Sequence, residues 1–393
     1  MTDPKPRAVV VICDGLGVGA APDAAAFGDA GTNTLAHVLR DGRAMVPNLA
    51  RLGLLHTLYA DAPPGLPAPH GAFGRMAEIS PGKDTTTGHW EMMGVPLERA
   101  FPLYPNGFPP EVIEPFERAT GKKALWNLPA SGTEIIEKLG AEHMRSGNPI
   151  VYTSGDSVFQ IAAHEEVVSI DTLYAWCEAA RAILVPPHEV GRVIARPFVG
   201  TPGTFRRTHR RKDFSVKPPA PTLLDRLLAA GRTVYGIGKI EDIFAGQGLS
   251  EAVHTESNRD GILRTIAAVR DRRDDFVFTN LVDFDAKYGH RNDPKGYAAA
   301  LEELDAFLPE LLGALRPGDL LLFSADHGGD PSDVSTDHTR EYVPVVATGP
   351  GIHPGADIGT RGTFADLGAT VAGHLGQAFP NGTSFLPLIR AVV

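Results

Sequence analysis

Short apolar runs recur along the chain, and each has the composition of a buried strand. They are rich in Val, Ile, Leu and Phe and do not alternate with polar residues, as expected for strands covered on both faces. These runs span residues 8–13, 233–237, 276–282, 320–325 and 343–348. We therefore expect them to form parallel strands of one sheet.

Helical patterns lie between the later strands. Residues 222–230 carry paired leucines one turn apart, and Gly231 follows as a C-terminal stop. A longer apolar stripe runs from Tyr297 to Leu315, but Pro309 interrupts it, so we expect a kink or two helices there. Strands that alternate with helices predict an α/β fold with a mostly parallel sheet between helices.

The middle of the chain differs from both ends in its pattern of apolar and polar residues. Pro-rich segments at about 102–110 and 217–221 bound a region with weaker alternation. Because the predicted core strands lie near residue 10 and beyond residue 230, we expect a core formed by residues 1–100 and 218–393. Residues 101–217 would then be an inserted, smaller α/β cap domain.

Composition and charge exclude several classes of function. The chain has 393 residues and a formal net charge of -10, which argues against a nucleic-acid or membrane-surface binder. No stretch approaches the roughly 20 apolar residues of a membrane span. With two cysteines, Cys13 and Cys177, a disulfide framework is not indicated. We expect a cytoplasmic protein, and no oligomeric partner is evident.

Carboxylates and histidines gather where the predicted strands end. Ligands of open α/β sheets bind outside the carboxyl ends of the strands, so these segments should converge. The candidate metal ligands are Asp14, Asp285, His290, Asp326, His327 and His338.

Three Asp and three His are more than one catalytic metal needs. They suit two cations roughly 4 Å apart that clamp a phosphoryl group, and the mixed ligands favour Mn²⁺, Zn²⁺ or Fe. A single Asp after a strand is more often a cap or turn residue. The metal hypothesis therefore depends on the joint pattern.

A candidate nucleophile lies in residues 82–94. There, hydroxyl side chains and a Gly precede a helix-like run, and the N-terminus of a helix favours a phosphate. A metal-bound Thr could attack phosphorus and form a covalent intermediate. The spacing does not choose among Thr85, Thr86 and Thr87, and an ordinary Thr N-cap is the alternative.

The predicted cap contains candidate groups for a phosphorylated sugar. Small polar residues and Asp156 follow a strand-like run near residue 152, and residues 206–212 contain five permanent cations. Together with Arg192 and Arg196 upstream, these cations could bind a phosphate. The alternatives are a solvated loop or a weak RNA-binding patch.

Taken together, these segments resemble the phosphopentomutase family of the alkaline phosphatase superfamily. Asp-His-Gly at 326–328 marks only the superfamily, whereas Lys-Asp-Thr-x-Thr-Gly-His-Trp-Glu at 83–91 is far more specific. Further similar segments lie at 27–35, 282–291 and 336–341. The family usually has Asn after Asp-His-Gly, where this chain has Gly329.

The resemblance implies roles for individual residues. Thr85 would be the phosphorylated nucleophile and would bridge two Mn²⁺ ions. One ion would be bound by Asp14, Asp326 and His327, and the other by Asp285, His290 and His338. The substrate would be bound by Ser154, Asp156, Arg192, Arg206 and Lys239, although Arg207 could take the place of Arg206.

The activity implied by the resemblance is that of an isomerase of nucleoside and pentose phosphate metabolism. It would interconvert ribose 1-phosphate and ribose 5-phosphate, and the 2-deoxyribose phosphates, after priming by glucose 1,6-bisphosphate or a pentose bisphosphate. A cofactor-independent phosphoglycerate mutase or a phosphatase of the same superfamily is the main alternative. A non-enzymatic phosphate- or RNA-binding protein is a second alternative.

Overall fold

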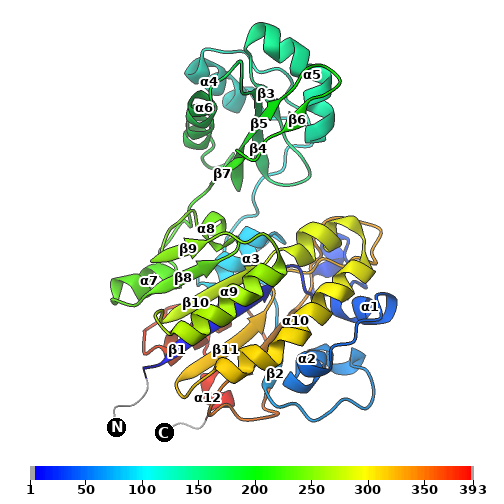
Figure 1. Cartoon of the computed structure of the whole chain (residues 1–393), viewed down its shortest axis with the longest axis vertical. Helices are drawn as coiled ribbons and strands as arrows, with labels where there is room; N and C mark the ends of the chain where they lie inside the picture. The colour runs from blue at the N-terminus through cyan, green and yellow to red at the C-terminus, as the bar shows by residue number, and fades with distance from the viewer. Residues whose placement is uncertain (1–4, 391–393) are drawn as a thin grey trace. The chain divides into compact units, whose positions relative to one another are not determined.

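The computed structural model describes residues 5–390, which form two compact units (Figure 1). The core unit contains the chain up to Ala100 and again from Pro218, and the cap unit is Phe101–Lys217. Each unit has its own sheet and its own apolar core.

The core unit is built on an eight-stranded sheet with the order β13-β2-β12-β11-β1-β10-β8-β9. Its strands are β1 (Arg7–Cys13), β2 (Ala72–Met76), β8 (Val234–Ile237), β9 (Glu251–Val253), β10 (Phe276–Leu281), β11 (Asp319–Ser324), β12 (Val343–Thr348) and β13 (Asp357–Arg361). All residues of β1, β10 and β11 are buried, which agrees with their unbroken apolar sequences. The predicted α/β fold with a mostly parallel sheet is confirmed.

The prediction that all five apolar runs are parallel is wrong for β12. This strand pairs antiparallel with both β11 and β2. The reason lies in the connection: residues 325–342 leave β11 at its carboxyl end and enter β12 at the same edge of the sheet. Because the chain makes no crossover there, β12 has to run back along β11.

Helices cover the core sheet. They are α1 (Thr34–Asp41), α2 (Pro47–Leu52), α3 (Thr85–Met92), α7 (Leu223–Ala229), α8 (Ile240–Ile243), α9 (Asn258–Asp271), α10 (Pro294–Ala314), α11 (Ala365–His374) and α12 (Leu386–Ile389), with short turns η1 (Ala24–Phe27), η2 (Leu54–Asp61), η3 (Phe284–Tyr288) and η4 (Gly289–Arg291). α9 and α10 pack side by side over the sheet (Figure 1), and α11 packs on β1 and against α3. None of the helices in residues 5–390 is long and apolar enough to span a bilayer.

Both helical predictions can be compared with the structure. α7 begins with a capping box between Thr222 and Asp225 and ends just before Gly231. The sequence predicted a kink or two helices at Pro309; α10 is one helix that continues through this residue, so two separate helices are ruled out. Proline cannot donate to the carbonyl of Asp305, four residues earlier. Asn48 compensates, because its Nδ2 donates to that carbonyl at 3.1 Å and to the Asp305 carboxylate at 3.0 Å.

The cap unit has a five-stranded sheet with the order β3-β4-β5-β6, in which β7 also pairs with β5. Its elements are α4 (Pro110–Thr120), α5 (Gly132–Ser146), β3 (Ile150–Tyr152), β4 (Val158–His164), α6 (Ile170–Ile183), β5 (Arg192–Val199), β6 (Arg206–Arg207) and β7 (Lys212–Ser215). Val193 and Ala195 of β5 belong to the apolar cluster under α4 and α6, and Phe198 belongs to a second cluster under α5.

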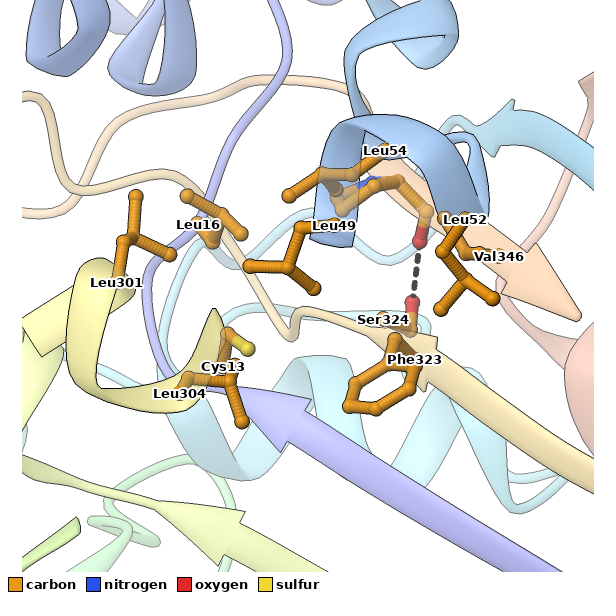
Figure 2. A pocket seen from close by; sticks show the side chains of 11 residues that line it. Cys13, Leu16, Leu49, Leu52, Leu54, Leu301, Leu304, Phe323, Ser324 and Val346 are labelled. Atoms are coloured by element: carbon orange, nitrogen blue, oxygen red, sulfur yellow. Dashed lines mark hydrogen bonds between the residues drawn. The ribbon is translucent and has the colours of Figure 1, made fainter. Parts of the chain in front are cut away.

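A small apolar cavity of about 10 Å³ lies behind the strand ends of the core (Figure 2). Residues that line it include Cys13, Leu16, Leu49, Leu301, Leu304 and Phe323. The Ser324 hydroxyl at its edge already donates to the Pro344 carbonyl at 2.7 Å. Because a buried water needs several polar partners, we expect this cavity to stay dry and rigid.

Truncation of Leu301 to Ala should enlarge this cavity and lower the free energy of unfolding by about 3 kcal/mol. The matched control is Leu263→Ala on α9, where the side chain is 42% exposed, and it should change stability by less than about 0.5 kcal/mol. Urea unfolding of both variants measures the difference. Equal losses would show that Leu301 is not tightly packed.

Candidate active site

Two groups of three ligand-type side chains meet at the carboxyl edge of the core sheet. Within each group the ligand atoms all lie within 4.8 Å of one another. The first triad comprises Asp14, Asp326 and His327, and the second comprises Asp285, His290 and His338. The structure therefore brings together all six side chains that the sequence singled out as metal ligands, in the two sets named above.

The two triads are neighbours. The rings of His327 and His338, one from each triad, are stacked with their centroids 3.8 Å apart. Asp14 and Asp326 follow β1 and β11, Asp285 lies just after β10, and His338 comes from the segment before β12. The antiparallel return of β12 is what places His338 at the same edge as the parallel strands.

Each histidine is held with its Nε2 turned toward a carboxylate of its own triad. The Nδ1 atoms of His290, His327 and His338 lie 2.7, 2.8 and 3.0 Å from backbone carbonyls. Since a carbonyl only accepts, each Nδ1 carries the proton and donates it, which leaves Nε2 as the ligating nitrogen. This is the orientation that metal-binding histidines adopt.

Several buried atoms of the triads lack hydrogen-bond partners among the described residues. They are Asp14 Oδ1, Asp285 Oδ1, Asp326 Oδ2 and His338 Nε2. A buried carboxylate oxygen without a partner is costly, and a cation removes that cost. The donor set of carboxylate and imidazole fits Mn²⁺, Zn²⁺ or Fe rather than Ca²⁺. The residues present therefore fit a pair of divalent cations.

The pKa shifts at the site also indicate that it favours positive charge. Burial alone would lower the pKa of His327, but the carboxylates of Asp326 and Asp14 raise it well above its ordinary value. Burial would likewise raise the pKa of Asp285, but His338 and His290 hold it well below its usual range. The carboxylates and imidazoles thus stabilise each other's charged forms, and a bound metal ion would supply the positive charge that the carboxylates favour.

Thr85 lies beside this pair of triads. Its Oγ1 is 3.2 Å from Nε2 of His327, and the residue is the first of α3. The N-cap of that helix is Asp84, which accepts from the Thr87 N–H at 3.1 Å and from the Thr87 hydroxyl at 2.5 Å. Of the two buried threonines in this turn, Thr85 and Thr87, Thr85 is the one brought to the triads.

Two further residues that sequence reasoning missed support the triads. Asn280, at the end of β10, donates from Nδ2 to Asp14 Oδ2 at 3.0 Å. His89 donates from Nδ1 to the Thr85 carbonyl at 2.8 Å, and Asp326 Oδ2 lies 3.2 Å from the same nitrogen. The available signals were an Asn at the end of an apolar strand and a His one helical turn after Thr85.

Gly88 and Gly329 show how closely the backbone packs here. A Cβ at Gly88 would collide with the Asp326 carbonyl, so glycine lets α3 approach the end of β11. At Gly329, where the family usually has Asn, a Cβ would lie 3.7 Å from Asp285 Oδ1. A side chain would have room there, so this chain lacks one possible partner for the Asp285 carboxylate.

The cap unit has a cluster of arginines on the face of its sheet opposite α4 and α6. Arg192 and Arg196 of β5 point away from the cluster under α4 and α6, and Arg207 pairs across the strands with Phe198 on their face. Burial and the nearby Arg211 and Arg207 lower the pKa of Arg196 to about 10. Mutual repulsion of these cations favours an anionic ligand.

The other residues predicted to bind substrate lie in three different places. Asp156 lies in the β3–β4 turn with Ser154, and its carboxylate is 3.5 Å from the Arg192 guanidinium. Arg206 pairs with Val199, so it faces the side opposite to Arg207 and is not brought to this cluster. Lys239 belongs to the core, where it follows β8 at the carboxyl edge of the sheet.

Comparison with known proteins assigns the family. The model of the Metalloenzyme superfamily matches residues 6–378. A phosphopentomutase of Anaeromyxobacter dehalogenans strain 2CP-C is 57% identical over 389 residues, which is 98% of this chain and 99% of the relative. One of Caldanaerobacter subterraneus is 54% identical and covers 97% of both chains. This chain belongs to the phosphopentomutase family.

The match extends through both units, so the cap is a regular part of the family's architecture. Among solved structures, the PH0037 protein from Pyrococcus horikoshii has a TM-score of 0.51 and 14% identity, and the match covers 96% of this chain and 100% of that one. At this identity the likeness concerns the fold. Members of the phosphopentomutase family are isomerases of the mutase type, and the two triads lie in segments that the family match includes.

Replacement of Asp285 by Asn should lower the bound Mn²⁺ from about two ions to about one per chain, because the second triad loses its charged ligand. Asp283→Asn is the matched control: this carboxylate accepts from the Asn258 N–H and the Lys287 ammonium, outside the triads. Metal analysis after gel filtration measures both. Unchanged metal content in Asp285→Asn would contradict the assignment of the second triad.

Proposed function

We propose that this chain interconverts ribose 1-phosphate and ribose 5-phosphate, and the corresponding 2-deoxyribose phosphates, through a phosphorylated Thr85. The observation that carries this proposal is the position of the Thr85 hydroxyl at the N-terminus of α3, 3.2 Å from His327 of one triad. Membership of the phosphopentomutase family supplies the substrate class.

The residues of the site support a transfer in two halves. The bond between phosphorus and Thr85 Oγ1 breaks as a hydroxyl of the pentose monophosphate attacks phosphorus, and the proton of that hydroxyl passes to Thr85 Oγ1, which becomes a free hydroxyl. The sugar bisphosphate then returns its other phosphoryl group to Thr85. Two Mn²⁺ ions held by the triads would supply Lewis-acid stabilisation of the charge on the transferring phosphoryl oxygens.

The surroundings of Thr85 suit a hydroxyl that carries a phosphate. The position of Thr85 at the N-terminus of α3 favours negative charge, because the helix dipole is positive there. His89 holds the Thr85 carbonyl, so the residue is fixed from within its own helix. A sugar bisphosphate, such as glucose 1,6-bisphosphate, would phosphorylate a fresh enzyme.

The arginine face of the cap would bind the non-reacting phosphate. Arg192, Arg196 and Arg207 are the cations that share this face, and Arg offers paired donors to phosphate oxygens. Ser154 and Asp156, in the turn beside Arg192, would bind sugar hydroxyls, and Lys239 would contribute from the core.

Both cysteines are free and buried, which fits an enzyme of the reducing cytoplasm.

Thr85→Ala should abolish turnover of ribose 1-phosphate in the presence of Mn²⁺ and glucose 1,6-bisphosphate, because no phosphoryl carrier remains. The neighbouring Thr86→Ala is the control and should keep activity within about threefold, since Thr86 is partly exposed. Release of free phosphate instead of ribose 5-phosphate by the wild type would indicate a phosphatase. Normal turnover by Thr85→Ala would refute the proposed nucleophile.

The adjacent arginines of β6 give a matched pair for the cap. Arg207→Ala should raise the KM for ribose 5-phosphate about 30-fold or more, because a charge-assisted contact contributes about 2 kcal/mol. Arg206→Ala, on the opposite face of the same strand, should leave KM nearly unchanged. Steady-state kinetics of both variants decides the assignment, and the reverse order of effects would restore Arg206 as the phosphate ligand.

A further inference from the structure

The segment that leads to Thr85 has little secondary structure of its own. Residues 77–84 connect β2 to α3, and their carbonyls converge on one side chain. The Arg340 guanidinium donates to the carbonyls of Glu78 at 2.8 Å, Ser80 at 2.8 Å and Gly82 at 2.6 Å. We call residues 77–84 the nucleophile segment. Three alternate residues of this segment are therefore held by the one buried guanidinium.

Every nitrogen of that guanidinium is engaged. Besides the three carbonyls, it donates to Glu78 Oε2 at 2.6 Å and to the Asp23 carboxylate at 3.0–3.2 Å. The guanidinium also lies 4.9 Å from the ring centre of Phe27, and its side chain is only 3% exposed. A guanidinium has five N–H groups in a fixed plane, so this set of acceptors specifies its position closely.

The same segment of chain carries a ligand of the second triad. His338 lies two residues before Arg340, and its Nδ1 donates to the Lys83 carbonyl at 3.0 Å. The Lys83 ammonium lies 3.1 Å from the carboxylate of Asp29. The same carboxylate accepts a hydrogen bond from the backbone N–H of Arg340 at 2.7 Å. The nucleophile segment and the His338 segment are thus joined at several points.

The N–H groups of residues 79 and 80 in the nucleophile segment are bound by a different side chain. The Glu91 carboxylate of α3 accepts from the N–H groups of Ile79 and Ser80 at 2.8–3.2 Å. A Cβ at Gly82 would lie 2.7 Å from the Thr87 hydroxyl, so the segment also packs tightly against the first turn of α3. Glu91 therefore binds N–H groups of this segment, whereas Arg340 binds its carbonyls, so the two side chains hold different backbone groups.

We propose that Arg340 is a positioning residue, which fixes Thr85 relative to the second triad by holding the backbone of residues 78–82. This inference rests on the proposed role of Thr85 as the phosphoryl carrier. In-line transfer tolerates little error in the position of the attacking atom, so the effect of Arg340 is on the rate of transfer rather than on substrate binding. Lysine cannot replace it, because an ammonium lacks the planar donors that reach several carbonyls.

The test compares Arg340→Lys with Arg7→Lys in the Mn²⁺-loaded protein. Arg7 is a matched control: its side chain is also 3% exposed and forms a buried ion pair with Asp319, but at the opposite end of β1 from Asp14. The measurements are kcat and KM with ribose 1-phosphate, the rate of Thr85 phosphorylation by glucose 1,6-bisphosphate, metal content and melting temperature. Thr85→Ala is measured alongside.

Arg340→Lys should lower kcat and the rate of Thr85 phosphorylation together by about 100-fold, with KM changed less than about threefold and metal content retained. Arg7→Lys should lower the melting temperature and leave kcat unchanged. Equal kcat values for the two variants, or a loss of metal that accounts for the lost rate, would overturn the proposal.

A second variant keeps the test decisive if Arg340→Lys folds poorly. Asp23 is about half exposed, and its carboxylate orients the outer edge of the guanidinium. Asp23→Asn should therefore fold normally and lower kcat by about 3- to 10-fold without a change in KM, in line with the loss of one charged partner. Unchanged kcat in this variant would also contradict the positioning role.

The proposed function is tested separately by the same experiment. If the wild type is phosphorylated on Thr85 but converts no pentose phosphate, the substrate assignment fails, while the phosphorylation rates still decide the role of Arg340. If Thr85→Ala is phosphorylated as fast as the wild type, the nucleophile is wrong. In that case the Arg340 proposal, which depends on it, is also rejected.

Discussion

The structure of the core depends on a concentration of buried negative charge at the ends of its central strands. Asp14, Asp285 and Asp326 are all at least nine-tenths buried and lie in two adjacent groups. Carboxylates in such surroundings need compensating positive charge, because desolvation penalises each of them by several kcal/mol. Cations would bind at the triad carboxylate oxygens that lack a hydrogen-bond partner among the described residues.

The rest of the core explains how this charge is held in place. The carboxylates follow the parallel strands β1, β10 and β11. His338 lies just before the antiparallel strand β12, which follows β11 without a crossover. Backbone carbonyls fix the tautomer of each histidine, and Asn280 orients Asp14. Thr85 reaches the same edge from α3, whose close packing on the end of β11 depends on Gly88. The position of Thr85 is therefore a consequence of strand topology together with a few buried polar contacts.

Much of this could be predicted from the sequence, for identifiable reasons. Unbroken apolar runs indicated β1, β10 and β11 because these runs are short and rich in β-branched, Leu or Phe residues, as strands buried on both faces are. Asp14, Asp285 and Asp326 were candidates because they follow those runs within a few residues. The direction of β12 was missed, since local composition does not record whether a connection crosses the sheet. The sequence left a kinked helix and two helices open at Pro309, since the contact between Asn48 and the Asp305 carbonyl joins residues remote in sequence.

The central physical claim is that two cations, one at each triad, neutralise the buried carboxylates near the Thr85 hydroxyl. Anomalous diffraction at the manganese edge from crystals of the Mn²⁺-loaded protein tests it most directly. The account predicts two peaks roughly 4 Å apart, one at each triad, with Thr85 Oγ1 next to both. A single peak, or manganese bound away from these side chains, would contradict it.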